Sequence, residues 1–357
     1  MSSQKLIHND LKIMSWNILA PGLMLYFWRS SYGLRTYGRT KDDYDQIQKI
    51  RIDNIVGNIK LHDPDILCLQ ETSNTIHQYL DNMSVQEYIA SKLRYTIVSE
   101  SFKDSEMGYD YPSTEQNRTL FMDSGVATLI KINSRNVRYI ETLVNANDFS
   151  GSKVFKSGIG SPFVLDAFEM KRTDIKFCLG NVHIRMSYPH IKQPLDEFYE
   201  RLTDDQKHEE FQNCIVTGDF NAHKIIGARE LFTSQLYEHM FDFQGSELID
   251  DHVFLGNNIL NYDVEVQYNS ELPMLQMGAN YPEIGRRWTN MHTRFDLNRQ
   301  NNVLINTEVA TSDHIPIIIT IKFESGHRLK RAFGLRELIN SHIDTRGYEL
   351  HEGRLSL

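Results

Sequence analysis

The sequence is poor in the features that mark several large classes of protein. It has three cysteines, Cys68, Cys178 and Cys214, with no C-x-x-C spacing, which argues against a disulfide framework and a zinc site. Each lies in an apolar stretch, so we expect three small core residues in a reducing compartment. No apolar run approaches the roughly 20 residues that cross a bilayer. The first residues, MSSQKLIHNDLKI, contain no apolar signal segment, which predicts a cytoplasmic or nuclear protein, with export that leaves no cleavable signal as the alternative.

Positive charge is also scarce, since 38 Lys and Arg residues face 47 Asp and Glu residues, for a net charge of −9. This balance disfavours a protein that binds polyanions non-specifically. It is compatible with an enzyme whose carboxylates hold a divalent metal against phosphate. The sequence also has no G-x-S-x-G elbow of a serine hydrolase, no Walker loop and no Rossmann glycine pattern.

What the sequence does contain is a series of short β-branched strands separated by helices and long polar loops. The apolar content of 40% and the charged content of 24% are those of a globular protein. The helical patterns cover residues 44–61, with Ile47, Ile50, Ile55 and Ile59 on one face, residues 85–93 and residues 195–211. The strand patterns include a hairpin that turns at Lys171–Thr173 and two strands with a turn at Gly256–Asn258. Residues 101–123 and 269–306 are polar and unpatterned, which predicts two long surface loops.

Polar side chains follow several of the predicted strands. In CIVTGDFNAH, the apolar run ends at Gly218, which predicts a sharp turn, and Asp219 and Asn221 come directly after it. Each such residue alone has an ordinary interpretation, such as a turn former or a core histidine. Together they are a costly way to build a core, because buried charges need a metal or one another. The set comprises Asn17, Glu71, Asn181, His183, Asp219, Asn221, Asp251, His252, Asp313 and His314.

These residue types fit the hydrolysis of a phosphoester. That reaction needs a hard cation held by oxygen ligands, a base for the attacking water and donors for the developing charge. Glu71 is the expected Mg²⁺ ligand and Asn17 the neutral oxygen beside it. His314, preceded by Asp313, offers an imidazole and a second carboxylate.

The order of the motifs resembles the endonuclease/exonuclease/phosphatase superfamily, which has the DNase I-like fold. The matching stretches are MSWNIL, DILCLQE, GNVHI, VTGDFNA, IDDHVFL and SDHIPI, within residues 11–323. The resemblance implies an α+β fold, a four-layer α/β/β/α sandwich, with the site at one end of the sheets. We therefore expect a catalytic domain over residues 1–323 and a charged, partly helical tail over residues 324–357. That tail is either a terminal helix packed on the body or a partner-binding element.

The resemblance also implies roles for the site residues. Glu71, with Asn17 beside it and Asp313 at or near the metal, is expected to hold Mg²⁺, for which Mn²⁺ can substitute. His183 is expected to donate to the scissile phosphate, and Asn221 to orient it. Asp219 is expected to position or deprotonate the water, and His314 to pair with Asp251; which of Asp219 and His314 is the base stays open. Because the gap from Asp251 to Asp313 is long for the family, Asp250 and Asp296 are alternative partners of His314. Glu115 is a candidate acid partner of His183.

Within the superfamily, NILAPGL, a Tyr-rich insert and RIDNIVGNIKLHDPDILCLQE are most similar to the deadenylase/nocturnin-type branch. The predicted function is therefore a Mg²⁺-dependent phosphodiesterase that acts on RNA or a nucleotide. One alternative is a lipid-directed phosphoesterase of the sphingomyelinase or inositol-phosphate phosphatase kind, which the acidic surface and the lack of a basic stripe favour. A catalytically inactive binding module is another, but it would have no need of these polar residues.

Overall fold

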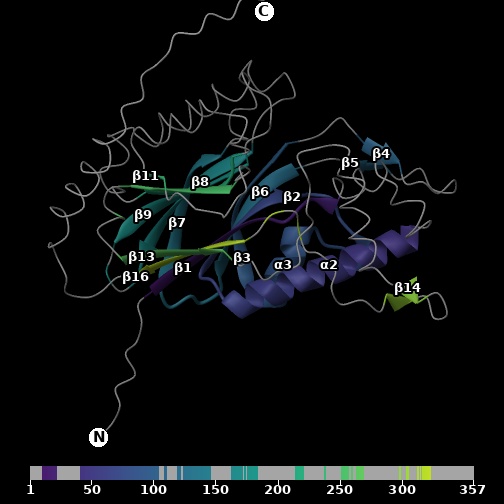
Figure 1. Ribbon diagram of the computed structural model, residues 1–357. Helices are drawn as coiled ribbons and strands as arrows, with labels where there is room; N and C mark the ends of the chain where they lie inside the picture. Colours follow the sequence, from purple (N-terminus) through teal and green to yellow (C-terminus); the bar gives the residue numbers. More distant parts are fainter. Residues whose placement is uncertain are drawn as a thin grey trace, which may run out of the picture.

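Two six-stranded β-sheets form the body of the protein in the computed structural model (Figure 1). Both sheets are mixed, because each contains one parallel pair among antiparallel neighbours. The structure describes residues 10–21, 41–103, 108–110, 119–121, 124–145, 162–171, 173, 175–183, 214–220, 237–238, 251–256, 259, 263–268, 297–298, 303–304, 312, 314 and 316–322.

The first sheet has the spatial order β13-β16-β1-β2-β6-β3. Its strands are β1 (Asp10–Asn17), β2 (Ile66–Thr72), β3 (Tyr95–Lys103), β6 (Ser124–Lys131), β13 (Asp263–Tyr268) and β16 (Ile317–Lys322). Strands β1 and β2 are parallel, with Asn17 opposite Gln70, so their carboxyl ends meet at one edge of the sheet.

The second sheet has the spatial order β11-β12-β10-β9-β8-β7. Its strands are β7 (Val137–Asn145), β8 (Phe163–Met170), β9 (Lys176–His183), β10 (Cys214–Asp219), β11 (Tyr237–Glu238) and β12 (Asp251–Leu255). The antiparallel pair of β8 and β9 confirms the hairpin expected around Lys171–Thr173. Strands β9 and β10 are parallel, with Asp219 opposite His183.

The main core lies between the sheets. On β1 it takes Leu11 and Ile13, on β2 Ile66 and Cys68, and on β16 Ile317 and alternate residues beyond it. The three cysteines are free and buried, as expected, and burial raises the pKa of each thiol. Because side chains alternate along a strand, the intervening residues of the first sheet face the opposite way.

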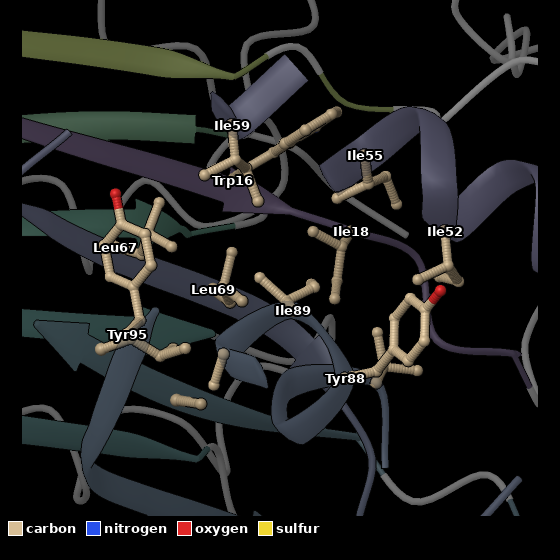
Figure 2. Close-up of a cluster of buried hydrophobic side chains, with 14 of the residues drawn as sticks. Trp16, Ile18, Ile52, Ile55, Ile59, Leu67, Leu69, Tyr88, Ile89 and Tyr95 are labelled. Carbon is tan, nitrogen blue, oxygen red and sulfur yellow. The ribbon is translucent and has the colours of Figure 1, made fainter. Parts of the chain in front are cut away.

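Helices α2 (Lys41–His62) and α3 (Val85–Leu93) cover that outer face, and the short helix η2 (Gln78–Leu80) precedes α3. Figure 2 shows Trp16, Leu67 and Leu69 of the sheet against isoleucines of α2 and the aromatic rings of Tyr88 and Tyr95. Helix α3 begins at a capping box, in which the Ser84 N–H donates to Glu87 Oε2 at 2.8 Å. Two packed sheets with helices on an outer face confirm the α+β sandwich.

Several details differ from the sequence-based expectations. The buried face of α2 carries Ile52 with Ile55 and Ile59, whereas Ile50 is half-buried, because five residues of helix place Ile50 about 140° from Ile55. Strands β12 and β13, expected to share one turn, belong to different sheets. The first expected loop contains the pair β4 (Gly108–Asp110) and β5 (Thr119–Phe121), and the second contains β14 (Leu297–Asn298) and β15 (Val303–Leu304). The expected helix at 195–211 and the tail at 324–357 lie outside the described residues.

None of the described helices is long and apolar enough to cross a membrane.

Candidate active site

The space between the sheets changes from apolar to polar along the strands. On β9, Phe177 and Leu179 belong to the core, Asn181 comes next on the same face, and His183 ends the strand. Strand β1 repeats this order with Leu11, Ile13, Ser15 and Asn17, and β10 with Ile215, Thr217 and Asp219. The period of two therefore carries each strand-end polar side chain to the inner face at the same edge of the sandwich.

Glu71 reaches this edge through a break in the alternation. Gln70 already faces inward, so the next residue of a regular strand would point toward the helices. The pairing of β2 with β6 shifts register between Gln70 and Thr72, and Glu71 has φ 56°. A bulge with a residue in the left-handed region re-aims its side chain, at a conformational cost of about 1–3 kcal/mol for a non-glycine residue. The fold thus strains Glu71 to bring its carboxylate into the site.

The amide of Asn17 joins two carboxylates from different sheets. Its Nδ2 donates to Glu71 Oε1 at 3.0 Å and to Asp219 Oδ2 at 2.9 Å, and all three side chains are buried. Its Oδ1 accepts the Leu19 N–H at 3.0 Å, so the amide nitrogen, and not the oxygen, faces the two acids. The other oxygen of Glu71, Oε2, accepts the Ala20 N–H at 3.0 Å.

Glu71, His183 and Asp219 form a group that can hold a metal ion, with one ligand atom from each within 4.8 Å of the others. His183 Nε2 lies 3.5 Å from Asp219 Oδ2 and 3.8 Å from Glu71 Oε1. Ligands of one Mg²⁺ are at most about 4.2 Å apart, so these pairs fit around one ion. Carboxylate oxygens favour a hard cation such as Mg²⁺ or Mn²⁺ over soft metals. Two buried carboxylates this close also gain from a cation, because a positive charge offsets their mutual repulsion.

His314 lies between two carboxylates of the second sheet. Asp219 on β10 and Asp251 on β12 are direct cross-strand partners. His314 Nδ1 is 2.6 Å from Asp251 Oδ2, and its Nε2 is 3.7 Å from Asp219 Oδ2. Because an ionised carboxylate only accepts, Nδ1 carries the proton of that hydrogen bond and Nε2 is left to take or give a proton toward Asp219.

Short contacts fix His314 against the end of β1. Its backbone N–H donates to Ser312 Oγ at 3.2 Å, and the Ser312 hydroxyl donates to the Asn17 carbonyl at 2.6 Å. The Trp16 indole N–H donates to the His314 carbonyl at 3.1 Å. Ser312 and Trp16 were not among the residues predicted for the site, although they lie inside the motifs SDHIP and MSWNIL, respectively.

Gly218 has a different role from the sharp turn expected at the end of the apolar run. Strand β10 continues through it to Asp219, and Gly218 adopts φ 141°. A Cβ at this position would lie 2.0 Å from the Val182 carbonyl oxygen of β9. Glycine therefore permits the close approach of β9 and β10 that sets Asp219 beside His183.

A buried amide pair lies directly beneath the site. Gln70 Nε2 donates to Asn181 Oδ1 at 2.8 Å, and Asn181 Nδ2 donates to the carbonyls of Leu69 at 3.3 Å and Ala127 at 3.1 Å. Both side chains are fully buried. This pair connects β9 to β2 and β6. Gln70 directly precedes Glu71, and Asn181 lies two residues before His183, so the pair fixes the spacing of the sheets at the site.

Farther from the site, Asp166 on β8 is fully buried between the sheets. The Ser99 hydroxyl donates to its Oδ2 at 2.6 Å and the Thr142 hydroxyl to its Oδ1 at 2.8 Å. Burial raises the pKa of this carboxyl above its ordinary value, and the two hydroxyl donors oppose that shift.

The structure brings together six of the predicted site residues: Asn17, Glu71, His183, Asp219, Asp251 and His314. His252 instead packs on the outer side of its sheet, edge to face with Phe220. Asn221 and Asp313 lie outside the described residues, as do the alternative acids Asp250, Asp296 and Glu115.

Comparison with known families gives a match to the model of the endonuclease/exonuclease/phosphatase family over residues 14–314. That span includes every described residue of the site. The chain belongs to the endonuclease/exonuclease/phosphatase family. Members of this family hydrolyse phosphoester bonds, which is the chemistry that the paired acids and imidazoles suggest. No curated protein sequence matches the chain.

Solved structures of the family share its fold. The catalytic domain of human nocturnin with bound sulfate has a TM-score of 0.51 at 16% identity, and the alignment covers 89% of this chain and 96% of that one. ANGEL2, a 2′,3′-cyclic phosphatase, has a TM-score of 0.51 at 14% identity, with 90% and 97% of the two chains covered. At such identities the likeness shows the DNase I-like fold and not the substrate.

Proposed function

We propose that this protein is a divalent-cation-dependent phosphodiesterase that acts on RNA or a nucleotide. The observation that carries the proposal is the placement of the Glu71, His183 and Asp219 group beside the His314 and Asp251 pair, with Asp219 common to both. A cation bound by the first group would hold the phosphate, and the His314 imidazole, hydrogen-bonded to Asp251, would transfer a proton.

In this proposal Glu71 is the principal cation ligand, and Asn17 holds it in place by its hydrogen bond. Asp313, beyond the described residues, is proposed as a further ligand. When bound, Mg²⁺ or Mn²⁺ would neutralise charge on the phosphate oxygens and orient the group for attack. The same cation would offset the repulsion between Glu71 and Asp219.

The remaining residues act on the phosphate and on water. His183 Nε2, which lies 3.8 Å from Glu71 Oε1, serves in this proposal as a donor to a phosphate oxygen and not as a ligand of the cation. Asp219 orients the attacking water, and His314, held by Asp251, moves a proton at Nε2. Asn221, outside the described residues, is proposed to orient the phosphate.

The substrate class rests on family likeness and on charge. ANGEL2 is a 2′,3′-cyclic phosphatase that was solved with adenosine-2′,3′-vanadate, and its TM-score to this chain is 0.50 in that complex. Together with the nocturnin likeness, this favours a nucleotide or an RNA end over other phosphoesters. The net charge of −9 favours a short or terminal substrate over a long polyanion bound along its length.

The test is hydrolysis in Mg²⁺ and in EDTA over a panel: oligo(A), an oligonucleotide with a 2′,3′-cyclic phosphate, duplex DNA, sphingomyelin and an inositol phosphate. Glu71→Gln and His314→Ala are expected to abolish the wild-type activity. Glu141→Gln, on the exposed side of β7, makes the same chemical change outside the site and should retain it. Activity that survives in His314→Ala would contradict the proposed roles.

A lipid-directed activity is the second candidate, because a protein of net charge −9 lacks the positive charge that draws polyanions to a surface. Cleavage of sphingomyelin or of the inositol phosphate, without cleavage of either oligonucleotide, would replace the nucleotide proposal with this one.

A further inference from the structure

A charged side chain that does not belong to the Glu71, His183 and Asp219 group is fully buried near it. Arg51 is on α2, and its relative exposure is 0%. Arginine is almost never fully buried unless its donors are paired, because removing the guanidinium from water is expensive. The contacts of Arg51 therefore indicate what its burial achieves.

Arg51 binds the chain just after β1. Its Nη1 donates to the Ile18 carbonyl at 2.6 Å, and its Nη2 donates to the Leu19 carbonyl at 2.8 Å. On the other side, Nε donates to Gln48 Oε1 at 2.9 Å, one turn earlier in the helix. The planar guanidinium thus holds two consecutive carbonyls from a rigid helix.

The same short segment holds Glu71. The Ile18 N–H donates to the Gln70 carbonyl at 3.0 Å, and the Ala20 N–H donates to Glu71 Oε2 at 3.0 Å. Between them, Leu19 adopts φ 54°, in the left-handed region that a leucine rarely occupies. A segment in this conformation needs contacts that over-determine it, and the carbonyls bound by Arg51 flank the strained residue.

We propose that Arg51 is a positioning residue for Glu71, acting through residues 18–20. By fixing Ile18 and Leu19, it sets the Ala20 N–H against Oε2 of Glu71, which leaves Oε1 facing Asn17 and His183. Arg51 does not touch the reacting atoms. The inference deepens the proposed function and rests on it for the identification of Glu71 as the cation ligand.

Three variants separate positioning from general support of the fold. Arg51→Met keeps length and removes all donors. Arg51→Lys keeps the charge but cannot reach both carbonyls with a planar fork. Ile59→Ala is the matched control, because Ile59 is buried on the same helix near its far end and its side chain is purely apolar. It weakens the packing of α2 without removing a bond to residues 18–20.

The first readout is hydrogen exchange of the Leu19 and Ala20 amides in the absence of metal, and the second is Mn²⁺ affinity by titration calorimetry. In Arg51→Met we expect faster exchange at both amides than in Ile59→Ala, and a loss of Mn²⁺ affinity of about 10–100-fold, the range for partners that orient metal ligands. Arg51→Lys should fall between wild type and Arg51→Met, and Ile59→Ala should bind Mn²⁺ like wild type.

Exchange that is the same in Arg51→Met and Ile59→Ala would overturn the proposal, as would lost protection with unchanged Mn²⁺ affinity. If the wild type binds no Mn²⁺, the cation part of the proposed function fails. The amide exchange then decides alone whether Arg51 holds the contact of Ala20 with Glu71.

Discussion

Replacing Asn17 by Asp tests the central hydrogen bonds of the site with almost no change of shape. In the wild type, one amide nitrogen donates to Glu71 at 3.0 Å and to Asp219 at 2.9 Å. The variant puts a carboxylate in its place. At this distance and an effective dielectric of about 20, each new pair of like charges repels by about 5 kcal/mol.

The protein can avoid most of that repulsion by binding a proton, which limits the loss of stability. Protonating a carboxyl of ordinary pKa, about 3.9, costs about 4 kcal/mol at about pH 7. The protonated acid keeps one O–H donor, so one hydrogen bond to a charged group is lost, worth about 1.5–3 kcal/mol. We therefore expect Asn17→Asp to lower the free energy of unfolding by about 6 kcal/mol at neutral pH in EDTA.

The dependence on pH distinguishes this reasoning from a simple packing defect. At about pH 5 the proton costs about 2.7 kcal/mol less, so the loss should shrink by that amount. Asn17→Ala removes the same donors without adding a titratable group, so its loss should change much less between the two pH values. Excess Mg²⁺ should stabilise Asn17→Asp more than wild type, because a cation balances the added charge.

Urea unfolding of wild type and both variants, followed by circular dichroism at the two pH values in EDTA and in Mg²⁺, measures all of these differences. If Asn17→Asp is as stable as wild type at neutral pH in EDTA, the two carboxylates are not both close and ionised. If the gap between Asn17→Asp and Asn17→Ala stays constant with pH, the protonation argument is wrong.

Three further predictions concern the neighbouring structure. Asp251→Asn should keep the melting temperature within a few degrees but lower kcat by about 10²-fold or more. The amide oxygen can still accept from His314 Nδ1, but the variant lacks the negative charge that, 2.6 Å away in wild type, keeps the proton on that nitrogen; an unchanged kcat would refute the role. Gly218→Ala should destabilise by about 3 kcal/mol or more in urea unfolding, since its Cβ would lie 2.0 Å from the Val182 carbonyl oxygen, and a neutral result would exclude the close approach. Asp166→Asn should gain stability over wild type as pH rises. Burial raises the folded-state pKa of Asp166, so the folded protein binds the proton of this carboxyl more tightly than the unfolded chain does. Wild type therefore loses stability as pH rises from the unfolded-state pKa to the folded-state pKa, whereas Asp166→Asn does not. A pH series in which the difference in melting temperature between variant and wild type does not change in favour of the variant would contradict this.

The alternation of strand residues made much of the site predictable. Asn17, His183 and Asp219 each follow inward-facing apolar residues at intervals of two, so their shared edge follows from the strand pattern and the parallel pairs. The helix expected over residues 85–93 is α3 with the same bounds, and the capping box of Ser84 and Glu87 fixes its start.

Other features depend on contacts that no local pattern contains. The bulge at Glu71 arises from how β2 pairs with β6, so the sequence showed a strand that ends and not a side chain that turns inward. The separation of β12 and β13 into different sheets depends on which partner each strand finds: β12 pairs with β10, and β13 pairs with β16. Arg51 looked like one more charge on an amphipathic helix, because a buried and an exposed arginine have the same local sequence signal.

The arrangement of the rows explains why this edge of the sandwich is suited to a cation. In the second sheet, His183, Asp219 and Asp251 occupy one row across three adjacent strands. In the first sheet, Asn17 and Gln70 form the facing row, and the bulge adds Glu71 to it. Two contacts between the rows join the sheets: Asn17 donates to Asp219, and His183 lies near Glu71. Gln70 makes a third contact between the sheets, to Asn181 one row deeper.

A ligand bound between two rows stabilises the contact between the sheets that carry them, because it binds only the packed form. At about 100 times its dissociation constant, a cation would add about 2.7 kcal/mol to the free energy of unfolding. Since Glu71 comes from one sheet and Asp219 from the other, that energy acts on the packing of the sheets and not on either sheet alone. In the proposed function, a bound cation offsets the strain at Glu71 and the burial of two close carboxylates, so the packing of this edge should loosen when that cation is removed.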